Sequence, residues 1–369
     1  MGFLTNRAAA TTNHIPALDG LRGLAAVIVV VSHISNATGL WNVLLGAGAG
    51  QIGVMLFFVL SGYLMAYLYV DRPFTGAEVW TYAVRRVARV LPLFYLVVLA
   101  AVALEEFGRL AGISLTFYAI GDLPRLLLLI RGTDVFWTIP VEIHFYILFL
   151  AVWWLHAKSP LAAFVAVAVA IVSAMLAYDE AGFSRFLFHA PFFLSGVLVS
   201  RLSGAVEMKS SRVDAKALAL AVVFASVFLI FPGIWSRMFG TGSLTFATPE
   251  QMWHHPVYLI VVSGCLLAAL RSRPVAAFLS SRPLVGLGNI SYSIYLLHIP
   301  VVIALARFTP LVRTPELFLI AGLAATIAIA AISYICVELP ARRGLNALFA
   351  PRKRTHRPSH VADDALTAG

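Results

Sequence analysis

Long apolar runs separated by short polar segments make up most of this chain. A helix needs about 20 apolar residues, with a range of about 17–25, to cross the hydrocarbon core of a bilayer. Reading runs of about this length as spans gives an all-α polytopic membrane protein, a bundle of about ten transmembrane helices. The predicted spans are residues 20–38, 52–70, 90–107, 141–156, 160–178, 184–201, 215–235, 255–270, 287–306 and 316–337.

One apolar stretch does not fit this scheme. Within residues 108–134, the segment LPRLLLLIRG is too short to cross a membrane and too apolar for an ordinary loop. It predicts an interfacial or re-entrant helix on the outer side. Counting it as a span would invert every later loop and weaken the asymmetry of the basic residues.

The basic residues indicate the orientation. The chain carries 27 lysines and arginines and a net charge of +10. With the N-terminus inside, twenty of these residues fall in the predicted inner segments and seven in the outer ones. Because cytoplasmic loops are rich in lysine and arginine, this predicts an even number of spans with both termini cytoplasmic. The same bias explains the net charge, so no nucleic-acid partner is implied.

The apolar pattern also predicts the domain organisation. Residues 1–17 form a short cytoplasmic arm that does not resemble a secretory signal, so the first span is expected to be an uncleaved anchor. Residues 18–345 form one membrane-embedded domain. Residues 346–369 form a basic and then polar cytoplasmic tail, which is expected to be disordered and to face lipid headgroups at its basic end.

The first span carries two ionisable residues on one face. Arg22 and His33 are eleven residues apart, so on a helix they return to nearly the same direction roughly 16 Å apart. An ionisable residue inside a membrane helix is a functional-site hypothesis by default, because its desolvation must be offset by partners. The alternative is a histidine bonded only to a neighbouring helix.

Two further segments combine small or basic residues. Ser61-Gly62 lies in an aromatic helix, where a small pair favours close helix packing over a nucleophilic serine. Arg85, Arg86 and Arg89 stand before the third span, at a predicted helix start. They are either a topology anchor or a fork for phosphates, to which a helix N-terminus would add its dipole. The spacing leaves both interpretations open.

Two outer segments carry the remaining polar candidates. Glu142 lies at the outer start of the fourth span, near the depth assigned to His33, and is the expected partner of that histidine. Tyr292, Tyr295 and His298 share one helix face at three-residue spacing. An aromatic belt explains the tyrosines, but His298 again falls in the outer half of a span.

Common catalytic and cofactor motifs are absent from the sequence. There is no Walker loop, HExxH or GxSxG, and no histidines cluster at metal-ligand spacing within one helix. The two cysteines, Cys265 and Cys336, lie inside apolar runs and form no CxxC pair. We therefore expect no metal site and no permanently bound cofactor.

Six motifs in order resemble the acyltransferase-3 family of bacterial integral-membrane acyltransferases over about residues 14–345. They are LDGLRGLAAVIVVVSHI, FFVLSGYLM, RRVARVLP, FWTIPVEIHFY, LGNISYSIYLLHIP and VELPARR. One departure is Thr138-Ile139-Pro140, where the family often has serine, leucine and another small residue. The family's motif of arginine, ten residues and histidine corresponds to Arg22 and His33, and its RxxR motif to Arg86 and Arg89.

The resemblance implies transfer of an acyl group, often acetyl, from acyl-CoA to a hydroxyl of a sugar, glycolipid, polysaccharide or lipid-linked product. The expected location is the bacterial cytoplasmic membrane. His33 would be the general base, oriented by Glu142 in the family's glutamate position, because histidine has a suitable pKa for proton transfer. The expected donor-binding residues are Arg22, Arg86 and Arg89. The expected acceptor-binding or supporting residues are Ser61, Tyr292, Tyr295 and His298.

Two other classes of function remain open from the sequence. A transporter would use His33, Glu142 and His298 as a proton relay, although no internal repeat of the kind common in transporters is evident. A scaffold without catalysis would tolerate replacement of the same residues. Consumption of a thioester by the purified protein distinguishes the enzyme from both.

Overall fold

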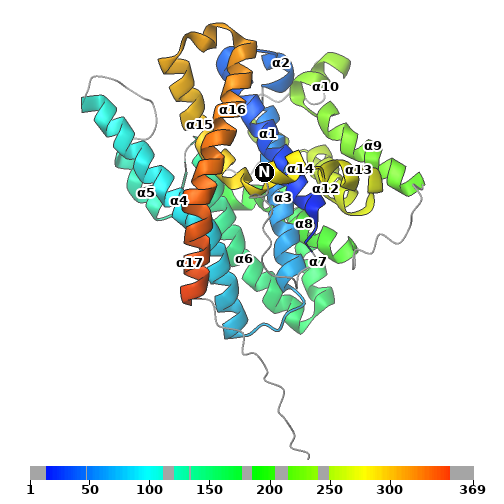
Figure 1. Ribbon diagram of the computed structural model, residues 1–369. Coiled ribbons are helices and arrows are strands. Elements are labelled where there is room, and N and C mark those ends of the chain that lie inside the picture. Colours follow the sequence, from blue (N-terminus) through cyan, green and yellow to red (C-terminus); the bar gives the residue numbers. More distant parts are fainter. Residues whose placement is uncertain are drawn as a thin grey trace, which may run out of the picture.

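The computed structural model describes residues 14–46, 48–110, 120–132, 134–176, 185–203, 215–239 and 249–349. Within these ranges every regular element is helical, and the helices pack into one bundle (Figure 1). The all-α fold class is therefore confirmed. Most of the predicted arm 1–17 and of the tail 346–369 lies outside the described residues.

The helices follow the predicted spans closely in order and position. The α-helices are α1 (Pro16–Thr38), α2 (Asn42–Leu45), α3 (Ala49–Tyr69), α4 (Gly76–Leu110), α5 (Leu123–Leu127), α6 (Thr138–Lys158), α7 (Pro160–Leu176), α8 (Arg185–Ser203), α9 (Ala215–Leu229), α10 (Pro232–Phe239), α11 (Pro249–His254), α12 (Pro256–Arg271), α13 (Arg273–Leu279), α14 (Arg282–Asn289), α15 (Ser291–Phe308), α16 (Pro315–Ser333) and α17 (Leu339–Phe349). Three 3₁₀ turns, η1 (Ile120–Asp122), η2 (Asp134–Trp137) and η3 (Pro310–Arg313), and one π-helical turn, η4 (Tyr334–Glu338), complete the regular elements.

The number of spans is lower than ten by helix length. In the described part of the chain, seven helices are long and apolar enough to cross a membrane, or up to nine if two bent pairs each count as one span. The bends are 95° between α9 and α10 and 91° between α12 and α13, and a proline stands at the start of each second helix. Proline lacks the N–H that would continue the preceding helix. Apolar α7 has only 17 residues, so the ten-span topology stays a prediction.

Helix α1 occupies the centre of the bundle. It packs against α3, α12, α13, α14, α15 and α16 (Figure 1). Small residues allow this close approach, because a Cβ on Gly20 would overlap the backbone of Leu279 and one on Gly288 would overlap the backbone of Asp19. The LDGLRG segment is thus fixed by backbone-to-backbone packing on α13 and α14.

Helices α3 and α8 form another tight pair. A Cβ on Gly62 would overlap the carbonyl group of Phe193, and one on Gly196 would overlap the carbonyl group of Val59. Close packing at the Ser61-Gly62 pair is therefore confirmed for Gly62. This contact holds α3, which carries Ser61, in a fixed rotation.

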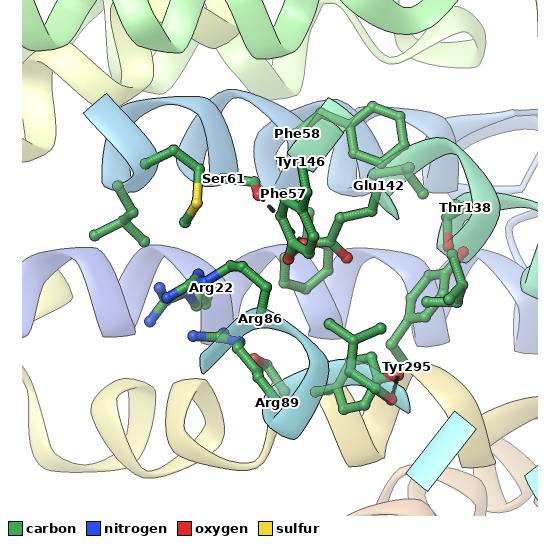
Figure 2. A pocket seen from close by; sticks show the side chains of 17 residues that line it. Arg22, Phe57, Phe58, Ser61, Arg86, Arg89, Thr138, Glu142, Tyr146 and Tyr295 are labelled. Atoms are coloured by element: carbon green, nitrogen blue, oxygen red, sulfur yellow. Dashed lines mark hydrogen bonds between the residues drawn. The ribbon is translucent and has the colours of Figure 1, made fainter. Parts of the chain in front are cut away.

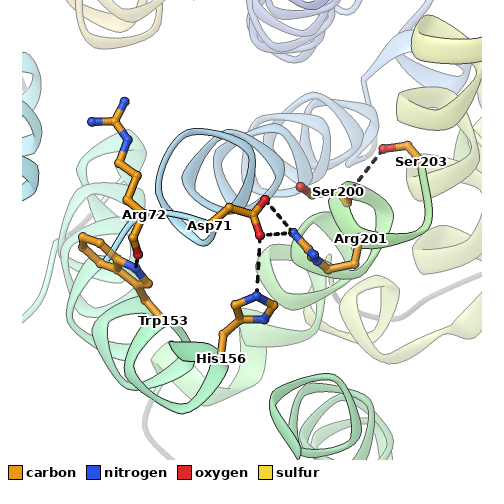
Figure 3. A network of polar contacts seen from close by, with 7 residues as sticks. All are labelled: Asp71, Arg72, Trp153, His156, Ser200, Arg201 and Ser203. Carbon is orange, nitrogen blue, oxygen red and sulfur yellow. Dashed lines mark hydrogen bonds and ion pairs between the residues drawn. The ribbon is translucent and has the colours of Figure 1, made fainter. Parts of the chain in front are cut away.

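A polar network joins the C-terminal ends of α3, α6 and α8 (Figure 3). Both carboxylate oxygens of Asp71 accept hydrogen bonds from Nη1 of Arg201, at 2.9 and 3.0 Å, and His156 Nε2 lies 3.6 Å from Oδ1. Trp153 Nε1 donates to the carbonyl oxygen of Arg72 at 2.9 Å. Because Asp71 is exposed, the ion pair adds little stability by itself and mainly fixes these helix ends.

Helix α4 begins earlier than predicted. It starts at Gly76, so Arg85, Arg86 and Arg89 lie about three turns inside a 35-residue helix and not at its start. The predicted contribution of a helix N-terminus at these arginines is therefore wrong, since that dipole effect is confined to the first turn.

In the region of the predicted interfacial helix, residues 108–134, the described residues between α4 and η2 contain only a short α-helix preceded by a 3₁₀ turn. Helix α5 has five residues and is tied to α4 by a hydrogen bond of 3.0 Å from Tyr95 Oη to the carbonyl oxygen of Leu127. Leu128 and Ile130 after it are exposed, as expected for a segment at an apolar surface. Residues 111–119 lie outside the described residues.

The arginine asymmetry and the helix order together predict the topology. In a background without Cys265 and Cys336, single cysteines replacing Thr75 and Arg282 should be labelled from the cytoplasmic side by a membrane-impermeant reagent. A cysteine replacing Met238 should be labelled from the outer side, because seven predicted spans, α7 included, precede it. Labelling of the Thr75 and Met238 positions from the same side would contradict the ten-span prediction.

The contact between α3 and α8 predicts a stability effect. Gly62→Ala should lower the melting temperature in detergent, because the added methyl group forces two backbones apart at a cost of about 1–3 kcal/mol. Gly344→Ala is the matched control, since a Cβ on Gly344 of α17 meets nothing within 4 Å. Equal melting temperatures for the Gly62→Ala variant and the unmodified protein would show that α3 and α8 do not pack this closely.

Candidate active site

A cavity lies between α1, α3, α4, α6 and α15 (Figure 2). Each of the five helices contributes at least one polar or charged side chain to the cavity wall. These are Arg22 from α1, Ser61 from α3, Arg86 and Arg89 from α4, Glu142 and Tyr146 from α6, and Ser291, Tyr292 and Tyr295 from α15. The fold therefore gathers into one site most of the residues that the sequence nominated separately.

Three guanidinium groups gather at one end of the cavity (Figure 2). Arg86 and Arg89 are three residues apart and so share a face of α4. Arg22 approaches from α1, where its Nη1 donates a 2.6 Å hydrogen bond to Oδ1 of Asp19. The second oxygen of this buried carboxylate lies 2.5 Å from Nε2 of His14. The positive charge of Arg22 is therefore balanced by a carboxylate of its own helix.

The charges of the other two arginines are not balanced at close range. In the part of the chain that the structure describes, no carboxylate lies within 4 Å of Arg86 or Arg89. The guanidinium carbon of Arg86 lies over the rings of Tyr69 and Tyr146, 5.9 Å from each centroid, and its buried Nε has no hydrogen-bond partner among the described residues. A buried cation with free donor capacity indicates a site for an anion.

Glu142 lies near the middle of the cavity wall (Figure 2). Its Oε1 accepts a hydrogen bond from Ser61 Oγ at 3.2 Å and another, very short one from Tyr146 Oη one helical turn further along α6. Two hydroxyl donors thus hold the carboxylate in place between the arginine end and the rest of the cavity.

Two tyrosines of α15 form a wall of the cavity. Tyr292 Oη donates to the carbonyl oxygen of Val90 at 2.7 Å, and Tyr295 Oη donates to that of Val135 at 2.9 Å. These bonds tie α15 to α4 and to η2. Tyr295 lies at the end of the cavity away from Arg22 and Arg86 (Figure 2).

Beyond Tyr295 the structure places two histidines together. The ring centroids of His33 and His298 are 5.0 Å apart, and the ring of Tyr295 lies 5.9 Å from His298. Nδ1 of the fully buried His298 lies 2.7 Å from the carbonyl oxygen of Tyr295. Because a carbonyl can only accept, Nδ1 carries the proton, and the neutral ring presents a lone pair on Nε2. That Nε2 has no hydrogen-bond partner among the described residues.

A comparison with protein families identifies the chain. The sequence model of the family Acyl_transf_3, described as an acyltransferase domain, matches residues 15–338. The chain belongs to this acyltransferase family. The predicted resemblance is thus confirmed over nearly the whole chain, and the protein is a multi-pass bacterial membrane acyltransferase and not a member of a transporter family.

Curated relatives carry related names. The chain is 25% identical to the peptidoglycan O-acetyltransferase OatA of Listeria monocytogenes over 89% of this chain and 56% of the relative. It is 24% identical to the O-acetyltransferase OatA of Staphylococcus aureus over 93% of this chain and 60% of the relative. The chain thus spans less than two thirds of the length of these proteins. No solved structure matches it.

In this acyltransferase the expected pairing of His33 with Glu142 is not formed. Glu142 bonds to Ser61 and Tyr146, whereas His33 faces His298 and has Asp134 as the carboxylate in electrostatic range. The sequence predicted a similar membrane depth for His33 and Glu142. The direction of a side chain, however, depends on how its helix is rotated in the bundle. The rotation of α6 turns Glu142 toward α3.

Two carboxylates near the cavity were not assigned a role from the sequence. Asp19 stands three residues before Arg22, so the rule for pairs on one helix face would have found it. Glu338, in the VELPARR motif, is a carboxylate within a long apolar helix and is 5% exposed. Such a residue is a functional candidate on its own.

Proposed function

We propose that this acyltransferase moves an acyl group, with acetyl as the expected case, from acyl-CoA to a hydroxyl of a carbohydrate acceptor. The observation that carries the proposal is the convergence of Arg22, Arg86 and Arg89 on one end of an intramembrane cavity, where two of the three have no carboxylate within 4 Å among the described residues. Guanidinium groups bind phosphate oxygens in pairs, and CoA carries several phosphates.

The separation of the arginines from the histidine pair fits a long donor. With the CoA phosphates at the arginine end, the extended pantetheine arm would lie along the cavity past Ser61 and Glu142. The thioester would then approach Tyr295 and the His33–His298 pair. The positions of Arg22 and His33 on α1 differ by eleven residues, about 16 Å along the helix axis.

The proposed reaction moves one proton from the acceptor hydroxyl to the sulfur of CoA for each acyl transfer. The acceptor hydroxyl oxygen attacks the carbonyl carbon of the thioester, a C–O bond forms, and the C–S bond breaks. His33 takes the hydroxyl proton as general base, CoA leaves as a thiolate, and the His33 imidazolium gives the proton to that sulfur, which restores the base. The lone pair on Nε2 of His298 and the charge of Asp134 are the groups nearby that would stabilise the His33 imidazolium.

We propose peptidoglycan, or a lipid-linked precursor of it, as the first acceptor to test. The support is the similarity to the Listeria relative, which is named as a peptidoglycan O-acetyltransferase. Ser61 and Glu142 would contribute to the site by holding one wall of the cavity, and Tyr292 and Tyr295 by forming the wall on α15.

The function is tested directly with protein in lipid nanodiscs. Acetyl-CoA labelled in the acetyl group and a soluble peptidoglycan fragment should give a labelled, alkali-labile ester and one free CoA thiol for each ester formed. Ester formation without thiol release would show that the donor is not acyl-CoA. Failure to form an ester with any carbohydrate or lipid-linked acceptor would refute acyl transfer to a hydroxyl.

Removal of the unneutralised arginines should weaken donor binding. Arg86→Ala and Arg89→Ala should each raise the KM for acetyl-CoA more than that for the acceptor, because each charge-assisted hydrogen bond contributes about 1.5–3 kcal/mol. Lysine at either position should restore only part of the affinity, since it keeps the charge without the planar fork.

Arg85→Ala is the matched control for these variants, because Arg85 is the neighbouring arginine on α4 and does not line the cavity. Its KM for acetyl-CoA should stay near that of the unmodified protein. If the double variant Arg86→Ala with Arg89→Ala binds and turns over acetyl-CoA normally, these arginines serve only as a topology anchor.

The assignment of the base predicts a different kinetic signature. His33→Ala should lower kcat about 10²- to 10⁴-fold with little change in affinity for acetyl-CoA, because the base acts in the chemical step and lies away from the arginines. His144→Ala is a suitable control, since His144 contacts the ring of Phe186 and does not line the cavity. A folded His33→Ala protein with normal turnover would move the role of base to His298.

A further inference from the structure

A buried carboxylate, Glu338, lies directly behind the cavity wall and has no part in the proposed chemistry. It is the last residue of the π-helical turn η4, in a long apolar helix that runs from Pro315 to Phe349 beside α4 (Figure 1). Only 5% of its surface is exposed. An ionised group in such a place requires partners that offset its lost hydration.

The direct partner of Glu338 is on the back of α15. Ser293 Oγ donates a 2.9 Å hydrogen bond to Oε2 of Glu338, and Ser293 is completely buried. Its neighbour Tyr292 points the other way into the cavity and donates to the carbonyl oxygen of Val90 on α4. Glu338 therefore fixes the first turn of α15, which carries the cavity wall.

A single neutral hydroxyl does not balance a buried carboxylate charge. The positive charges in electrostatic range of Glu338 are Arg89, which lines the cavity, and Arg342, one turn further along the same helix. Neither lies within 4 Å of the carboxylate in the described part of the chain. Glu338 is thus in electrostatic range of Arg89, and no carboxylate of the described residues lies within 4 Å of that arginine.

The π-helical turn explains how Glu338 reaches this position. A π turn contains one residue more than an α turn, which rotates the side chains that follow by about 100° relative to the preceding helix. This rotation aims Glu338 at α15 and α4, whereas Ile335 and Cys336 in the same turn are exposed on the outer surface. Such turns occur frequently at functional sites.

We propose that Glu338 is a positioning residue for the donor site: its charge holds the Arg89 guanidinium, and its bond to Ser293 holds the wall of α15, in the arrangement that binds the donor phosphates. The inference rests on the proposed function. It gives the VELPARR motif a role in the anion site although no residue of that motif lines the cavity.

The direction in which the affinity for CoA changes when the charge of Glu338 is removed distinguishes a positioning role from a purely electrostatic one. Removing a negative charge near an anion site would by itself strengthen anion binding. If Glu338 positions Arg89, Glu338→Gln should instead weaken the binding of CoA about tenfold, with kcat changed less than about twofold. Glu338→Asp should restore part of the affinity, because it keeps the charge. Glu316→Gln removes a carboxylate from the exposed first turn of α16 and is the matched control.

The experiment measures the equilibrium binding of CoA itself to the full-length protein in nanodiscs, alongside KM and kcat for acetyl-CoA. In the Arg89→Gln background, Glu338→Gln should have little further effect, which a general loss of packing would not reproduce. Normal or tighter CoA binding by a folded Glu338→Gln protein overturns this inference alone. Absence of CoA binding by the unmodified protein overturns the proposed donor and this inference with it.

Discussion

Burial of positive charge inside an apolar bundle is the constraint on which this structure depends. Each guanidinium taken out of water must find a carboxylate, an aromatic face or an anionic ligand. Arg22 is satisfied by Asp19 within α1, and Arg86 lies over two tyrosine rings. The remaining positive potential faces the cavity. The positive charges of the site are thus only partly balanced by protein groups. The unbalanced charge is available to bind an anion.

The packing of small residues makes this arrangement possible. Gly20 and Gly288 bring α1 against α13 and α14, and Gly62 brings α3 against α8. With the backbones this close, the rotation of each helix is fixed by steric contact. The side chains of Arg22 and Ser61, each within two residues of one of these contacts, are therefore directed into the cavity by neighbours that have no chemical role.

The cavity has two chemically different ends. One end carries the guanidinium groups, and the other adjoins the His33–His298 pair, with Glu142 between them. A reaction with a large anionic donor and a proton transfer requires such a separation, because a cationic cluster next to the base would disfavour its protonation. Membership of an acyltransferase family agrees with this division.

The sequence alone determined the features that depend on local pattern. Apolar runs predicted the order and positions of the helices, and motifs predicted the family and the arginines of the cavity, because hydrophobic length and residue spacing are properties of single segments. Only the tertiary structure decided which side chains meet. It separated Glu142 from His33, paired His33 with His298 and joined Glu338 to Ser293 on α15. The physical reason is that a span fixes the depth of a residue, whereas its direction depends on helix rotation, bends and the π turn, all of which are set by packing between segments far apart in the chain.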